Sequence, residues 1–216
     1  MRSLARRAGR PVLDVGAGAG RVALDLARRG VEVVALDRDA VLLAALRERA
    51  AGLPVTIVKG DAGAFQLGPR FALVVGPMQT VQLLRGPGGR ARFLRCAARH
   101  LRPGVLLAAA LAEELEDFSP ALPLPPPDMA RDEGWTWTSQ PTGLRGEGPA
   151  VVLERVRETV APDRRRSAEH HAMRLDRLTA RVLEEEATAA GLRPLPRRAT
   201  PATEEHVGRT VVVVRG

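Results

Sequence analysis

A glycine-rich turn, Asp14-Val15-Gly16-Ala17-Gly18-Ala19-Gly20, holds the residues of this sequence whose types and spacing best suit ligand chemistry. Glycine at alternate positions lets the backbone turn sharply and approach a ligand closely. The helix expected after the turn offers unpaired N–H groups to a polar or negative group. Arg21 stands where the dinucleotide-binding pattern G-x-G-x-x-G needs its third glycine. Asp14 would also repel a pyrophosphate, so the turn favours a cofactor with a cationic end.

Two further carboxylates follow apolar runs that are expected to be strands. Asp37 follows Val31–Leu36, and Asp61 follows Val55–Val58. Ligands of open parallel sheets bind beyond the carboxyl ends of the strands, so both acids are candidates for a binding edge. The simpler alternatives are a helix cap for Asp37, for which Asp39 competes, and an ordinary turn for Asp61.

Taken together, these acids and glycines resemble the class I S-adenosylmethionine-dependent methyltransferases, and so does Leu101-Arg102-Pro103-Gly104. The resemblance runs from about Val12 to Leu111 and resumes over the last strands. It implies that Asp37 binds the ribose hydroxyls and that Asp61 receives the adenine amino group. The cofactor-binding residues that the resemblance implies are Asp14, Gly16, Ala17, Gly18, Gly20, Asp37, Arg38, Asp61, Ala62, Gly76 and Met78.

The first half of the chain alternates short apolar runs with helical patterns, which predicts a parallel α/β sheet. The expected strands are Pro11–Val15, Val31–Leu36, Val55–Val58, Phe71–Val75 and Val105–Leu111. The expected helices are Arg21–Arg29, Asp39–Ala51 and Arg90–Leu101, with Gly86–Gly89 as a turn before the last of them and Arg102–Gly104 as its end. The fold class is therefore α/β: a doubly wound, mostly parallel sheet of the Rossmann-like methyltransferase kind.

After Glu113 the pattern changes to prolines and then to alternating residues. The prolines between residues 120 and 127 predict a loop. The expected antiparallel strands are Gly134–Gln140, Ala150–Val160 and Ala168–Leu175, with Pro141–Pro149 as a hairpin loop. A helix over Leu178–Ala190 and strands over Leu192–Thr200 and Arg209–Val214 complete the chain. We expect one methyltransferase domain over residues 1–216, with 113–176 inserted as a strand-rich lid or acceptor segment.

Candidates for handling the methyl acceptor are few. Trp135 and Trp137 share one face of a strand, where they could wall an acceptor pocket or form a small satellite core. Gln79 could hold cofactor or acceptor by its amide, or simply begin a helix. His170 and His171 face opposite ways on a strand, so at most one could serve as a general base. No other catalytic residue is evident, and His100 and Cys96 are expected to be structural.

Composition narrows the function. The chain has 216 residues, 45% hydrophobic, and its longest apolar run is too short to cross a membrane. Its one cysteine excludes a disulfide framework and a cysteine-based zinc site, so we expect no metal and a cytoplasmic location. The net charge is +8, yet aromatic residues make up only 3%, which leaves few surfaces for base stacking and makes a nucleic-acid partner a poor fit.

These observations predict S-adenosylmethionine-dependent methyl transfer by in-line displacement to a small-molecule amine or hydroxyl. The family resemblance also suggests a homodimer formed through the inserted strands. Two alternatives stay open. The arginine excess would suit an RNA methyltransferase, and the ten residues before the first strand would suit a non-catalytic cofactor-binding or scaffold protein.

Overall fold

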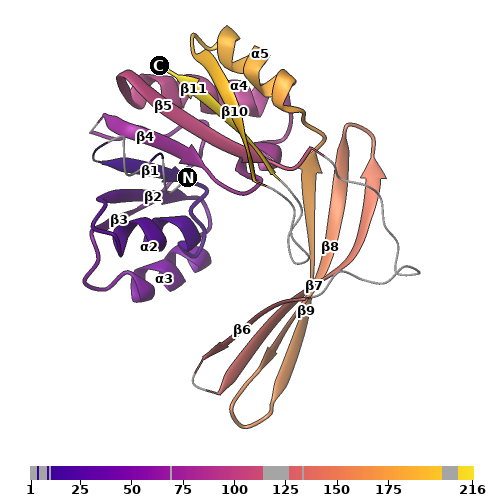
Figure 1. Cartoon of the computed structure of the whole chain (residues 1–216). Coiled ribbons are helices and arrows are strands. Elements are labelled where there is room, and N and C mark those ends of the chain that lie inside the picture. Colours follow the sequence, from indigo (N-terminus) through magenta and orange to yellow (C-terminus); the bar gives the residue numbers. More distant parts are fainter. Residues whose placement is uncertain are drawn as a thin grey trace. The chain divides into compact units, whose positions relative to one another are not determined.

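The computed structural model describes residues 4, 9, 11–68, 70–113, 127–132, 134–200 and 209–216. The chain forms two compact units, shown in Figure 1. The first unit comprises Met1–Ala112, Leu178–Thr200 and Arg209–Gly216. The second comprises Glu113–Arg177 with Pro201–Gly208. The longer segment of the second unit begins at the first residue of the predicted insertion, 113–176, and ends one residue beyond it.

The first unit is built on a seven-stranded sheet with the strand order β10-β11-β5-β4-β1-β2-β3. Its strands are β1 (Val12–Val15), β2 (Val33–Asp37), β3 (Val55–Lys59), β4 (Phe71–Gly76), β5 (Leu101–Leu111), β10 (Arg193–Thr200) and β11 (Arg209–Arg215). The first five strands pair in parallel, whereas β11 runs antiparallel to both β5 and β10. The doubly wound, mostly parallel sheet predicted from the sequence is thus confirmed.

Helices cover both faces of this sheet (Figure 1). They are α2 (Arg21–Ala27), α3 (Ala40–Arg49), α4 (Pro87–His100) and α5 (Ala180–Ala189), with a short 3-10 helix, η1 (Thr80–Leu83). Residues of α2 and α3 pack on one face, in a cluster that includes Val12. Residues of α4 and α5 pack on the other, in a cluster that includes Leu13. Because successive strand side chains alternate between faces, apolar strands of this kind are needed when both faces are covered.

Two predicted boundaries around α4 are wrong. The helix begins at Pro87 rather than Arg90, because proline fits the first helical position, where no N–H partner is needed. Gly89 lies inside its first turn, where an added Cβ would overlap the carbonyl of Leu84. The following strand begins at Leu101 rather than Val105, and the Gly104 N–H donates to the Gly216 carbonyl at 3.0 Å. Glycine and proline here lie within regular elements rather than between them.

The second unit is a four-stranded antiparallel sheet in the order β6-β7-β8-β9. Its strands are β6 (Asp128–Asp132), β7 (Trp135–Glu147), β8 (Ala150–Val160) and β9 (Arg166–Asp176). The inserted antiparallel sheet is confirmed, although β6 was not predicted. The proline-rich stretch before β6, which ends at Pro127, lies outside the described residues up to position 126.

The predicted hairpin loop over Pro141–Pro149 is also wrong, because β7 continues to Glu147 and only Gly148 and Pro149 connect it to β8. A register shift between Pro141 and Gly143 accommodates the missing proline N–H. The long hairpin ends in a small buried cluster of Leu144, Val151 and Leu175. No helix in the described ranges is long and apolar enough to cross a membrane.

Candidate functional site

Three carboxylates lie at the carboxyl ends of the neighbouring strands β1, β2 and β3. Asp14 is in β1, paired with Ala35 of β2 and Val75 of β4, and Asp37 ends β2. The Gly60 N–H donates to the Asp37 carbonyl at 2.9 Å, which places the turn that carries Asp61 beside the end of β2. The structure therefore brings the three acids to one edge of the sheet, as parallel pairing requires.

The carboxylate of Asp37 fastens the glycine-rich turn to β2. Its Oδ2 accepts a hydrogen bond from the Gly18 N–H at 2.8 Å, and its Oδ1 accepts one from the Asp39 N–H at 2.9 Å. Asp39, not Asp37, caps α3 by accepting hydrogen bonds from the first-turn amides. The helix-cap alternative for Asp37 is wrong. Each oxygen of a carboxylate has a second lone pair, so Asp37 can still accept hydroxyl hydrogen bonds.

The three glycines of the turn have different roles. All have positive φ: 74° at Gly16, 53° at Gly18 and 91° at Gly20. A Cβ on Gly16 would lie 2.7 Å from Thr80 Oγ1, and one on Gly20 would overlap the side chain of Leu46. A Cβ on Gly18 would meet only Leu42 Cδ1, at 3.8 Å. The outer glycines are therefore required by packing, while the middle one leaves open space on its side of the turn.

Asp14 lies under this turn, fully buried, and neither carboxylate oxygen has a hydrogen-bond partner of ordinary geometry in the described chain. Burial raises the pKa of Asp14 to about 7; the Ala23 amide at the start of α2 lowers it and the Asp37 carboxylate raises it further. A buried carboxylate without partners is costly unless it is protonated or meets a cation. This unpartnered group fits a cofactor whose nearby end is positively charged.

The loop after β4 carries the remaining predicted cofactor residues, Gly76 and Met78. Met78 has a φ of 59°, which is rare for a residue other than glycine, and its Sδ accepts a hydrogen bond from Arg209 Nη1 at 2.8 Å. Thr80 donates its hydroxyl to the Pro77 carbonyl at 2.7 Å and packs against Gly16. The loop is thereby held against the glycine-rich turn.

Gln79 lies at the N-cap position of η1, as the helix-start interpretation predicted, and its side chain makes no cap hydrogen bond there. Gln82, a fully buried polar side chain in this segment, was missed by sequence reasoning. Its amide nitrogen donates to the Ala112 carbonyl at 3.0 Å, and its amide oxygen accepts from the Ala112 N–H at 2.9 Å. Gln82 thus fixes the chain just beyond β5, and a polar residue between Val81 and Leu83 was its one signal in the sequence.

The flanking cofactor candidates are more exposed. Asp61 accepts a hydrogen bond from the Gly63 N–H at 2.7 Å, so the turn interpretation applies to it whatever else it binds. Ala62 packs, half-buried, against the apolar cluster on the α4 and α5 face, and Arg38 is exposed beside Asp37. Ala17 is buried within the turn.

In the second unit, Trp135 and Trp137 lie on one face of β7, as predicted. Their rings stack with centroids 6.0 Å apart and planes within 10°, and both residues are 40% exposed. The satellite-core interpretation is wrong for the described residues, because the buried cluster of this unit is Leu144, Val151 and Leu175.

His170 and His171 are both exposed on β9 and point to opposite faces. The register pairs His171 with Arg155, which donates to Ser139 on the same face as Trp137. His171, not His170, therefore shares the face of the two tryptophans.

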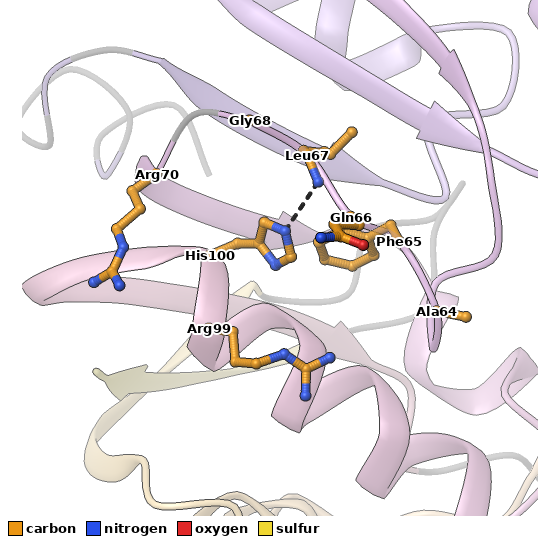
Figure 2. Close-up of a pocket in the computed structure, with 8 residues that line it drawn as sticks. All are labelled: Ala64, Phe65, Gln66, Leu67, Gly68, Arg70, Arg99 and His100. Atoms are coloured by element: carbon orange, nitrogen blue, oxygen red, sulfur yellow. Dashed lines mark hydrogen bonds between the residues drawn. The ribbon is translucent and has the colours of Figure 1, made fainter.

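A hollow of about 470 Å³ lies at the end of α4, where β5 begins, and so at the opposite edge of the sheet from the three acids. Figure 2 shows His100 among its lining residues, joined to the Leu67 N–H by a hydrogen bond of 3.0 Å at Nε2. Because Nε2 accepts, the ring is neutral there and Nδ1 donates to the Cys96 carbonyl at 2.8 Å. Cys96 is buried and its thiol donates to the Phe65 carbonyl. The structural roles predicted for His100 and Cys96 are confirmed.

Comparison with known proteins connects this geometry to a family. Residues 12–104 match the family described as "Methyltransferase domain". The chain is 34% identical over 96 residues to the cypemycin N-terminal methyltransferase of a Streptomyces species, covering 44% of this chain and 39% of the relative. It is 44% identical over 77 residues to the protein-L-isoaspartate O-methyltransferase of Methylorubrum extorquens, covering 34% of each. The matched segment thus spans well under half the length of these curated relatives.

Solved structures are similar over nearly the whole chain. DesVI of Streptomyces venezuelae superposes with a TM-score of 0.75 at 23% identity, covering 98% of this chain and 86% of that one. CalS10 of Micromonospora echinaspora, an amino pentose methyltransferase solved with S-adenosylmethionine bound, gives 0.71 at 23% identity, covering 100% and 86%. Residues 12–104 therefore match a methyltransferase domain, and the chain has the same fold as these solved methyltransferases.

Proposed function

We propose that this protein transfers a methyl group from S-adenosylmethionine to the amino group of a small molecule. The observation that carries the proposal is the unpartnered Asp14 beneath a glycine-rich turn that Asp37 fastens to β2. This pair lies inside the segment matched to the methyltransferase family. An amine is favoured over a hydroxyl because similar folds include an amino pentose methyltransferase and a sugar N-methyltransferase.

Residues from three strand ends and the turn would hold the cofactor, which supplies an electrophilic sulfonium methyl group when bound. Asp14 would face its cationic end, Asp37 the ribose hydroxyls and Asp61 the adenine amino group. The other proposed contacts are Gly16, Ala17, Gly18, Gly20, Arg38, Ala62, Gly76 and Met78. In-line displacement needs orientation and exclusion of water more than acid–base chemistry. The loop fixed by Thr80 and Met78 provides that rigidity.

We assign acceptor contacts to the inserted unit, and Gln79 stays a separate prediction in the first unit. Trp135 and Trp137 would form an apolar wall, because their stacked rings are 40% exposed on one face of β7. An ammonium acceptor must lose a proton before attack, and a neutral imidazole can take it. Of the two histidine candidates we favour His171, which lies on the tryptophan face, over His170, which does not.

Calorimetry with S-adenosylhomocysteine and a methyl-transfer assay test this function together. We expect binding that Asp37→Asn weakens at least tenfold, while Asp25→Asn, a control acid on the exposed side of α2, leaves it unchanged. Labelled S-adenosylmethionine offered with matched amino and hydroxy sugars should label the amino compound. No binding at millimolar concentration, or transfer to hydroxyls alone, would contradict the proposal.

We also propose that two copies associate through the inserted strands and that the protein works in the cytoplasm. Association is supported by Met129 of β6, an apolar side chain that is 54% exposed on the face opposite the two tryptophans. The cytoplasm is supported by a single, reduced cysteine. Light scattering should give twice the chain mass, and Met129→Arg should lower the measured mass. A monomer at high concentration would refute the association.

The proposed cytoplasmic location is checked by cell fractionation.

A further inference from the structure

Asp14 is placed where an ionised carboxylate has little to stabilise it. Its strand neighbours at that position are Ala35 of β2 and Val75 of β4, both apolar. The Ala23 amide of α2 stabilises the ionised form of Asp14, whereas the negative charge of Asp37 destabilises it.

The other charges nearby do not compensate. On α2, Arg21 is exposed and Asp25 pairs with Arg29 at 3.3 Å. On α3, Arg49 donates to the Ala19 carbonyl at 2.9 Å. The strand β4 has no charged residue. Among the described residues, each of these elements therefore leaves the Asp14 carboxylate without a cation.

We infer that Asp14 carries a proton in the cofactor-free protein and gives it up to solvent when the ammonium of the cofactor's amino-acid end takes the place of that proton. The inference rests on the proposed function. The charge balances, because one proton leaves the carboxyl as one unit of positive charge enters beside it. Cofactor binding is then coupled to the release of one proton from a named atom of this chain.

The direction of the pH dependence follows from the two states of Asp14. Below pH 7 the empty protein must lose a proton before it binds, so affinity falls as the pH falls, by up to tenfold per pH unit. Above pH 8 the carboxyl is already ionised and affinity becomes independent of pH. The released fraction at pH 7 is roughly half a proton, rising toward one at pH 6.

Calorimetry of S-adenosylhomocysteine binding measures this release directly. Titrations at pH 6, 7 and 8 in phosphate and in Tris separate the heat of buffer protonation from the heat of binding. We expect proton release that declines from pH 6 to pH 8, together with a dissociation constant about fivefold larger at pH 6 than at pH 7. Where the amino group of the ligand titrates within this range, binding as the ammonium takes up a proton, which is opposite in sign to the expected release.

Three controls keep the inference separate from the proposed function. Asp14→Asn should bind without proton release, whereas Asp25→Asn should release protons as the unmodified protein does. Methylthioadenosine, which lacks the ammonium, should bind the unmodified protein without release. Binding of S-adenosylhomocysteine with no release at any pH, or with equal release in Asp14→Asn, overturns the inference but leaves the function standing. No binding of S-adenosylhomocysteine at all overturns the function.

Discussion

The seven-stranded and four-stranded sheets differ in where they keep their polar side chains. In the unit built on the first, Gln82 and Arg90 are buried and hydrogen-bonded, and Asp14 is buried without a partner of ordinary geometry. In the second, the polar side chains of β9 from Arg166 to Ala172 are exposed, and the buried cluster lies at the far end of the hairpin. Polar side chains of the first unit are thus buried, whereas those along much of β9 are exposed to solvent. The proposed function assigns the cofactor to the first sheet and the acceptor to the second.

Removing one partner of a buried ion pair should give the largest loss and show how rigid the first sheet's helix layer is. Arg90 of α4 donates to both carboxylate oxygens of Glu186 on α5, at 2.7 and 2.8 Å. We expect Glu186→Ala to cost about 3 kcal/mol in urea denaturation, because the guanidinium stays buried. The exposed pair in the second unit, Arg165 with Asp163, is the control: Asp163→Ala should cost little. Equal losses of unfolding free energy in Glu186→Ala and Asp163→Ala would contradict the difference between a buried and an exposed ion pair.

The stability of the first unit should also depend on pH through Asp14. Its carboxyl titrates near 3.8 when unfolded and near 7 when folded, so between these values the folded state binds more protons. The folded state therefore loses stability as the pH rises through this range. We expect Asp14→Asn to gain about 2–3 kcal/mol relative to the unmodified protein between pH 5 and pH 8, measured by urea denaturation. A difference that does not vary with pH would contradict the buried state of Asp14.

Truncating the small cluster of the second unit tests whether that sheet depends on it. Leu175→Ala should cost about 2 kcal/mol, because the cluster is small and its neighbours collapse in part. Hydrogen exchange should accelerate in β7, β8 and β9, while β1 and β4 keep their protection. Uniform acceleration across both sheets would mean that the two units unfold as one.

Within the glycine-rich turn, alanine substitutions should separate packing from ligand access. Gly16→Ala should destabilise by roughly 1–2 kcal/mol more than Gly18→Ala, because only the former meets Thr80. Adding Thr80→Ala should restore part of the loss in Gly16→Ala and none in Gly18→Ala. If the proposed function holds, Gly18→Ala should weaken S-adenosylhomocysteine binding more than it weakens folding. If Gly16→Ala and Gly18→Ala lost equal stability and Thr80→Ala rescued neither, Gly16 would not be a packing position distinct from Gly18.

The smallest change in stability belongs to the exposed aromatic pair. Trp137→Ala should cost less than about 1 kcal/mol, because the ring is 40% exposed. The Michaelis constant for the acceptor should nevertheless rise, while S-adenosylhomocysteine affinity stays constant. Val182→Ala, at an exposed site on α5, is the matched control for both readouts. An unchanged acceptor constant would show that the tryptophans do not wall the acceptor site.

Sequence patterns predicted the first unit well because its strands are apolar and because the glycine-rich turn after β1 has an unusual glycine spacing. The placement of Asp14, Asp37 and Asp61 at neighbouring strand ends follows from the amino-acid sequence, since parallel pairing brings such ends together. The partners of Gln82 and Arg90 do not follow from it, because each lies at least 30 residues away in the chain.

Proline and glycine misled the sequence interpretation in both units, because their usual role as breakers depends on local geometry. Pro87 fits the first position of α4, and Pro141 adjoins a register shift in β7. The alternation in β7 predicted that Trp135 and Trp137 share a face, but no pattern specified how exposed that face is. Local periodicity gives side-chain direction, whereas exposure depends on the surrounding tertiary structure.

The two hydrogen bonds between the Gln82 side chain and the Ala112 backbone have a consequence for the inserted segment. The Gln82 amide pairs with both the N–H and the carbonyl of Ala112, the residue between β5 and the insertion. The backbone at the end of β5 is therefore hydrogen-bonded before the inserted sequence starts. Because Gln82 lies in η1, both hydrogen bonds that hold the residue after β5 come from the first unit. Substitutions confined to the inserted segment leave both partners of these bonds in place.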